Sequence, residues 1–274
     1  MRLPQEYHDR LFKRHTLNHK AYDDNHELQQ SIVSQISELG IPGNPFGIYQ
    51  NQTIGEYSFY VTLQYLDQLN IDAKDFYVIN SYGFRSEEFY SEHEGKHVLF
   101  AGCSVTFGDS MFIEDSWAKV LYNKLAETNS LSGYYNIGMP SASITDVASL
   151  LRTYIELIAI PDVVFINLPA IIRDDGAGID DLKDIINTYT ETEFITTSWD
   201  QTFTTESCSS DDPRLSIPGI VQFAQNDLLK YCYKMHKANK KEPFMLKGLD
   251  DSHPGIAEHS FYANLMLTNL GYNI

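Results

Sequence analysis

The 274-residue sequence predicts an α/β protein of three layers, in which helices cover both faces of a central parallel sheet. Two observations carry this prediction. From residue 96 onward, short apolar runs typical of buried strands alternate with longer segments of helical spacing. The apolar runs are also continuous rather than alternating, as expected of strands that are buried on both faces.

The first half of this region sets out the expected sheet. Residues 96–102 (KHVLFAG) form an apolar run that ends at a glycine, and residues 115–127 have helical spacing. Residues 133–138 (GYYNIG) predict a second strand, 143–159 an amphipathic helix and 161–169 a third strand. Such units imply parallel strands with right-handed crossovers, and sites form where loops leave the carboxyl ends of these strands.

The last hundred residues are less regular. We expect residues 176–215, which are acidic and rich in Thr and Ser, to form a surface excursion with a strand at 193–198. A helix is predicted over 217–237, and a final helix directly after His253, with Pro254 in the first helical position.

The chain ahead of the alternating region has a different character. We treat residues 1–94 as an N-terminal accessory region and residues 95–274 as the principal domain. Residues 21–40 have helical spacing and end at a glycine, as a helix C-cap should. The aromatic stretch 56–79 is compatible with helix or strand.

The charge of the chain limits its partners. A formal charge of −17 repels a phosphate backbone, so no nucleic-acid partner is expected. Residues 1–20 hold five basic against two acidic side chains, which we interpret as a solvated helix or arm rather than a binding patch.

Cysteine use and hydropathy indicate the compartment. Cys103, Cys208 and Cys232 are odd in number and lack metal-type spacing, so neither a disulfide framework nor a zinc site is expected. No apolar stretch approaches the roughly 18 residues of a membrane helix, and the N-terminus has no apolar signal region. We therefore expect a cytoplasmic protein without a membrane partner.

A serine follows the first predicted strand. Ser104 lies in the run Gly102-Cys103-Ser104-Val105, where the strand turns into a helix. A serine there projects from the carboxyl edge of the sheet, and the backbone N–H groups of the next turn point outward as donors for a developing oxyanion. Ser104 is therefore a candidate nucleophile; the alternative is an ordinary helix N-cap.

A histidine and a carboxylate precede the final helix. Asp250 stands three residues ahead of His253, close enough in a turn to hold Nδ1–H and leave Nε2 free to accept a proton. The positive end of the helix dipole would favour the neutral, basic imidazole. A surface turn without function is the alternative for this pair.

The two clusters together resemble the SGNH (GDSL-like) superfamily of esterases, lipases and carbohydrate O-acyl hydrolases. The first block of that superfamily reads Gly-Asp-Ser-x-Thr-x-Gly, and this chain matches it at Gly102, Ser104, Thr106 and Gly108, with Cys103 in place of the Asp. The closing block, Asp-x-x-His-Pro, is matched by Asp250, His253 and Pro254. The stretch from Asn80 to Arg85 (NSYGFR) resembles one that precedes the nucleophile strand in many of these proteins.

The resemblance implies a flavodoxin-like α/β/α fold and a triad of Ser104, His253 and Asp250. It covers residues 80–274. The literal string Gly108-Asp109-Ser110 spells the superfamily's nickname, but it falls beyond the end of the strand, so we expect Ser104 to be the nucleophile.

The expected oxyanion hole departs from the superfamily pattern. The resemblance places a backbone donor beside the N–H of Ser104, at Ser141 or, if the loop is shorter, at Gly138. The third block, Gly-x-Asn-Asp, is missing: Pro169 aligns with the Gly and Ile171 with the Asn. Asn167 at the strand end, or Arg173, is a candidate substitute donor, and a loop-capping Asn and a surface Arg are the alternatives.

These residues predict a serine esterase or O-deacylase that needs neither metal nor cofactor. The resemblance suggests a small acyl group, such as acetyl on a carbohydrate, as the substrate. The alternative is a catalytically weak SGNH-fold module that binds or supports a larger assembly. We expect Cys103 to be a buried small side chain rather than the nucleophile, and His259 to be structural.

Overall fold

The computed structural model describes residues 56–90, 94–173, 177–200, 203–238 and 253–271, together with residues 27, 30–31, 34–35, 38 and 247. The described positions between 27 and 38 are helical, in agreement with the helix predicted over 21–40. The stretch predicted as helix or strand is helical: α3 spans Glu56–Gln68 and α4 spans Ala73–Phe76.

The centre of the molecule is the predicted parallel sheet. Its strands are β1 (Val98–Gly102), β2 (Tyr135–Asn136), β3 (Val163–Leu168) and β4 (Glu193–Ser198). They are ordered β2-β1-β3-β4, and every adjacent pair is parallel. The four strands therefore end at one common edge.

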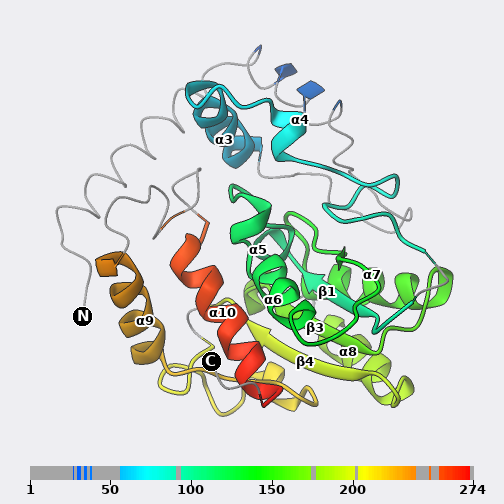
Figure 1. The fold of residues 1–274 in the computed structure, drawn as a ribbon. Coiled ribbons are helices and arrows are strands. Elements are labelled where there is room, and N and C mark those ends of the chain that lie inside the picture. Colours follow the sequence, from blue (N-terminus) through cyan, green and yellow to red (C-terminus); the bar gives the residue numbers. More distant parts are fainter. Residues whose placement is uncertain are drawn as a thin grey trace.

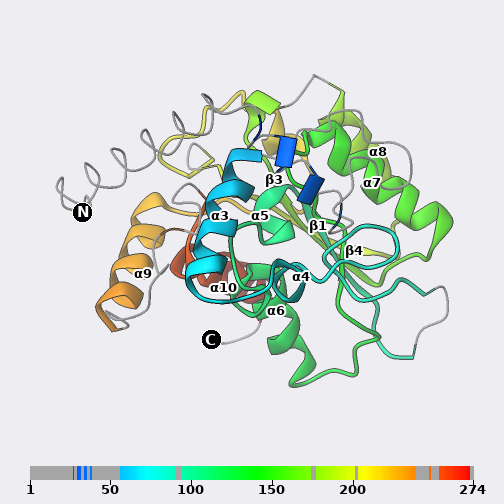
Figure 2. The same cartoon turned by 90° about the horizontal axis from the view of Figure 1, so that it is seen from above.

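Helices cover both faces of the sheet, as the sequence predicts. They are α6 (Trp117–Ala126), α7 (Ile144–Leu157), α8 (Gly178–Thr188), α9 (Gln225–Ala238) and α10 (Ile256–Asn269). On one face α10 packs between α6 and α9, and on the other α7 packs against α8 (Figures 1 and 2). The architecture is a three-layer α/β/α sandwich.

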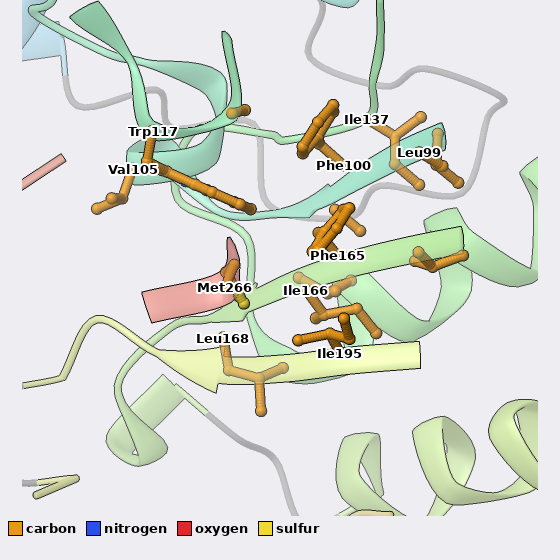
Figure 3. Close-up of a cluster of buried hydrophobic side chains, with 14 of the residues drawn as sticks. Leu99, Phe100, Val105, Trp117, Ile137, Phe165, Ile166, Leu168, Ile195 and Met266 are labelled. Atoms are coloured by element: carbon orange, nitrogen blue, oxygen red, sulfur yellow. The ribbon is translucent and has the colours of Figure 1, made fainter. Parts of the chain in front are cut away.

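The core is built from the side chains between these layers. The rings of Phe100 on β1 and Phe165 on β3 stack with centroids 5.6 Å apart, and the Trp117 ring meets Phe100 edge-on (Figure 3). Two aromatic residues that precede β1, Phe84 and Phe89, belong to the same core. Part of the accessory region is therefore packed into the interior.

Three local predictions are wrong. Residues 176–215 contain the strand predicted at 193–198, which is β4, but they are not a surface excursion, because they also contain α8 and the fully buried Arg214. The helix predicted over 217–237 begins at Gln225. The final helix begins at Ile256 with Gly255 as its N-cap, so Pro254 precedes the helix instead of occupying its first position.

The lengths and hydropathies of the helices bear on membrane crossing. Within the ranges that the structure describes, no helix is both long enough and apolar enough to cross a bilayer.

Candidate active site

The turn after β1 is sharp, and a glycine makes it possible. Gly102 has φ 155°, and a Cβ at this position would lie 2.5 Å from the Asn167 carbonyl oxygen on β3. Real Cβ atoms do not approach backbone so closely. The chain therefore passes from β1 directly into the single-turn helix α5 (Ser104–Phe107).

Ser104 is the first residue of α5, and the N-cap is Cys103, whose side chain makes no capping bond. The interpretation of Ser104 as an ordinary N-cap is therefore wrong. The backbone N–H of Ser104 donates to no described residue, as expected in the first turn of a helix. This N–H is available to a ligand at the nucleophile.

The Ser104 hydroxyl meets the predicted base. His253 Nε2 lies 3.0 Å from Ser104 Oγ, although the two residues are 149 positions apart in the chain. His253 is half-buried, just ahead of α10, and Ser104 is 4% exposed. The distance suits proton transfer between hydroxyl and imidazole. Asp250, the predicted third member, lies outside the described residues.

Ser110, the serine of the literal Gly-Asp-Ser string, is remote from this chemistry. It is fully buried, and its hydroxyl shares a hydrogen bond of 2.9 Å with Thr62 on α3. The neighbouring Asp109 accepts a hydrogen bond of 3.0 Å from the Tyr77 hydroxyl. Both side chains therefore form hydrogen bonds within the protein interior.

Cys103 is buried beneath the nucleophile. It is fully enclosed, and its sulfur accepts a hydrogen bond of 3.1 Å from the indole Nε1–H of Trp199. The sequence reasoning missed Trp199. The available signal was its position, since it directly follows the strand predicted over 193–198 at the carboxyl edge of the sheet.

One backbone donor was expected in the loop after β2, at Ser141 or at Gly138, and the structure treats these two residues differently. The Gly138 N–H already donates to Asn136 Oδ1 at 2.7 Å. Ser141 has a left-handed φ of 63°, is partly exposed, and donates its N–H to no described residue. Of the two candidates, Ser141 is therefore the one whose backbone N–H is not already used by a described residue.

The substitute side-chain donors are less accessible or more remote. Asn167 is fully buried, and neither its Oδ1 nor its Nδ2 has a hydrogen-bond partner among the described residues. Arg173 is exposed at the end of a short 3-10 helix, Ile171–Arg173. Ile171, aligned with the superfamily's Asn, packs partly against the core and offers no donor.

The surroundings of His253 include a second histidine. His259 on α10 is fully buried, and its Nδ1 accepts a hydrogen bond of 3.0 Å from the Trp117 N–H. Burial, and to a smaller extent the charge of His253, lower the pKa of His259 to about 3. His259 is therefore neutral and structural at neutral pH.

The described residues contain no group of three or more His, Cys, Asp or Glu side chains that could hold a metal ion.

Comparison with known proteins gives similarities of fold. No protein-family model matches the chain, and no curated protein matches it in sequence. Among solved structures, a psychrotrophic esterase, EstA, from Pseudoalteromonas sp., inhibited by monoethylphosphonate, is 14% identical with a TM-score of 0.43; the match covers 64% of this chain and 96% of the esterase.

Two further solved structures are similar. A member of the lipolytic G-D-S-L family from Veillonella parvula is 14% identical with a TM-score of 0.37, over 62% of this chain and 96% of that protein. The Bacillus subtilis protein YXIM is 15% identical with a TM-score of 0.40, over 65% of this chain and 57% of that protein.

Proposed function

We propose that this protein is a serine esterase or O-deacylase whose nucleophile is Ser104. One observation carries the proposal: Ser104 Oγ and His253 Nε2 lie 3.0 Å apart at the carboxyl edge of a parallel sheet. The local motifs that resemble SGNH hydrolases coincide with these two residues. A partly buried hydroxyl-imidazole pair beside a free backbone N–H is suited to acyl transfer.

The reaction follows from the geometry. Ser104 Oγ attacks the ester carbonyl while His253 Nε2 takes its proton, and the carbonyl oxygen becomes an oxyanion that accepts hydrogen bonds from the N–H groups of Ser104 and Ser141. Collapse of this intermediate breaks the bond to the alcohol, which receives the proton from His253. Water then attacks the acyl-enzyme by the same steps and releases the acid. In this scheme Asp250 holds the His253 imidazolium.

Proton transfer and oxyanion stabilisation are the two effects expected to accelerate the reaction most. Positioned proton transfer supplies about 10²–10⁴-fold in rate. Each preorganised oxyanion donor supplies about 10²–10³-fold. A site without the Asn donor of the superfamily's third block would therefore turn over more slowly than a complete site, but it would still react.

Burial supports a small acyl group. Ser104 is only 4% exposed, and Trp199 is fixed over the neighbouring Cys103. A nucleophile enclosed to this degree favours a small acyl group over a bulky one. The resemblance to a superfamily that includes carbohydrate O-acyl hydrolases supports an acetylated carbohydrate as the substrate.

The test is covalent labelling with a fluorophosphonate probe together with hydrolysis of p-nitrophenyl acetate. Wild type and Ser110→Ala should label and hydrolyse, whereas Ser104→Ala should do neither and His253→Ala should label at least 10²-fold more slowly. Ser110→Ala is the matched control for the identity of the nucleophile, because it removes the hydroxyl of another buried serine and leaves Ser104 and His253 in place. Failure of the wild type to label would refute the proposal, and loss of labelling only in Ser110→Ala would refute the choice of serine.

A second candidate is a catalytically weak module that binds acylated ligands or supports a larger assembly. Ile171 at the position of the superfamily's Asn favours it, because a side-chain donor is replaced by an apolar group. Labelling at Ser104 without multiple turnovers of p-nitrophenyl acetate would favour this candidate over the esterase.

A further inference from the structure

Arg85 is a buried cation from the segment that precedes β1. Its side chain is only 2% exposed. It lies against the rings of Phe76, Tyr77 and Phe107, with the guanidinium carbon 4.9 to 6.0 Å from the ring centroids. An arginine is rarely enclosed to this extent unless its donors are used.

The hydrogen bonds of Arg85 go to backbone carbonyls. Nη1 donates to the carbonyl oxygens of Gly108 at 2.6 Å and Met111 at 2.9 Å, and Nη2 donates to that of Phe76 at 2.6 Å. Gly108 and Met111 are the two ends of the turn that follows α5, here named the 108–111 turn. The planar fork of arginine can span both ends, which a lysine ammonium does less well.

The 108–111 turn is hydrogen-bonded to the backbone of the nucleophile. The N–H groups of Gly108 and Asp109 both donate to the carbonyl oxygen of Ser104, at 3.0 and 2.9 Å. A helix of one turn has little stability of its own. The position of Ser104 therefore depends on the turn that closes α5.

The turn itself needs external support. Gly108 and Ser110 have left-handed φ angles of 76° and 58°. For a residue other than glycine this conformation is strained and persists only where the surroundings impose it. Besides Arg85, the hydroxyls of Thr62 and Tyr77 bind this turn, through Ser110 and Asp109 respectively. Burial raises the pKa of Tyr77, so its phenol stays protonated as a donor to Asp109.

We propose that Arg85 is a positioning residue for Ser104: its fork fixes the 108–111 turn and, through the Ser104 carbonyl, the first turn of α5. Arg85 touches neither the substrate nor the reacting atoms. It keeps Ser104 Oγ within reach of His253 and keeps the Ser104 N–H directed at the oxyanion. This inference rests on the proposed esterase function.

The experiment measures the chemical step in Arg85→Lys and Arg85→Met, using the full chain. We expect kcat for p-nitrophenyl acetate and the rate constant of fluorophosphonate labelling to fall together, about 10- to 100-fold in Arg85→Met and less in Arg85→Lys, with KM unchanged. A purely structural role would lower the melting temperature and the fraction of folded protein, but not the rate per folded molecule.

Two further variants complete the test. Arg214→Lys is the matched control, because Arg214 is also fully buried but its guanidinium pairs with Asp200 and Asp212; it should lose stability and keep its labelling rate. Gly108→Ala disturbs the same turn and leaves Arg85 in place, since the new Cβ would lie 3.2 Å from Ser116 Cβ and 3.3 Å from Arg85 Nη1 and would strain a φ of 76°; it should label more slowly.

The outcomes separate the two proposals. If wild type labels, and folded Arg85→Met or Gly108→Ala labels within twofold of it, the role of Arg85 is refuted while the esterase stands. If both Arg85 variants fail to fold, the labelling rate of Gly108→Ala alone decides the same question. If wild type does not label, the esterase proposal itself has failed.

Discussion

The buried imidazole of His259 makes the stability of the fold depend on pH. Its side chain is fully enclosed, and burial, with a smaller effect from the charge of His253, lowers its pKa to about 3 from an ordinary value of 6.5. The unfolded chain therefore binds a proton at this residue below about pH 6.5, whereas the folded chain does not until about pH 3. The stability that the neutral imidazole contributes above pH 6.5 is lost as the pH falls.

The size of the effect follows from the two pKa values. Each pH unit between about 6.5 and 3 costs about 1.4 kcal/mol of unfolding free energy. Between pH 7.5 and pH 5.5, His259 alone should lower the free energy of unfolding by about 1.4 kcal/mol. That loss is large beside the 5–15 kcal/mol typical of whole domains.

The loss of unfolding free energy is measured by urea unfolding at pH 7.5 and pH 5.5, followed by tryptophan fluorescence. The control is His259→Asn, whose Oδ1 can still accept the Trp117 N–H but which does not titrate. This variant should be less stable at both pH values, because the ring leaves a cavity. Its loss between pH 7.5 and 5.5 should nevertheless be smaller than that of wild type by about 1.4 kcal/mol. Equal losses in the two proteins would refute the reasoning.

Three further substitutions test the oxyanion donors and the thiol. Asn167→Leu removes a buried amide that has no hydrogen-bond partner among the described residues, so we expect a gain of about 1–3 kcal/mol in unfolding free energy and unchanged kcat; a 10²-fold loss of kcat would instead make Asn167 an oxyanion donor. Ser141→Gly keeps the backbone N–H and relieves a left-handed φ, so it should gain about 1 kcal/mol in urea unfolding and keep its activity. Cys103→Ala removes the acceptor of the Trp199 indole, so it should lose about 1 kcal/mol and still label with fluorophosphonate; absence of labelling would point to the thiol.

The sequence predicts the sheet and its first helices because their signals are local. The apolar runs at 96–102 and 161–169 are continuous, and both become strands buried along their whole length. The pair Ser104 and His253 was likewise predicted from short motifs, and the fold brings their side chains together.

The misplaced helix over 217–237 shows where local signals fail. Its first apolar residues have helical spacing, but Pro218 and Gly219 interrupt them, and Gly219 takes a left-handed φ of 73°. The segment instead runs beside β4, where the Val221 N–H donates to the Thr196 carbonyl oxygen at 2.7 Å. Pairing with the edge of β4 outweighs the helix propensity of this segment. Thr196 and Val221 lie too far apart in the sequence for a local pattern to predict that they pair.

The helix α8 was missed for a different reason. Its acidic residues suggested a solvated segment, but Ile179, Leu182 and Ile185 form a buried stripe along one face, which packs against α7. The stripe has helical spacing and was present in the sequence. Composition averaged over residues 176–215 concealed a periodic pattern within them.

The packing of the segment before β1 bears on the division of the chain at residue 95. Phe84 and Phe89 are buried in the core beneath the sheet, and Arg85 between them is bonded to the turn that closes the nucleophile helix. Removal of a buried aromatic side chain costs about 3–5 kcal/mol, so loss of this segment would consume most of the stability of an ordinary domain. We infer that the boundary at residue 95 marks a change of sequence pattern, and that the folding unit which forms the active site begins before it.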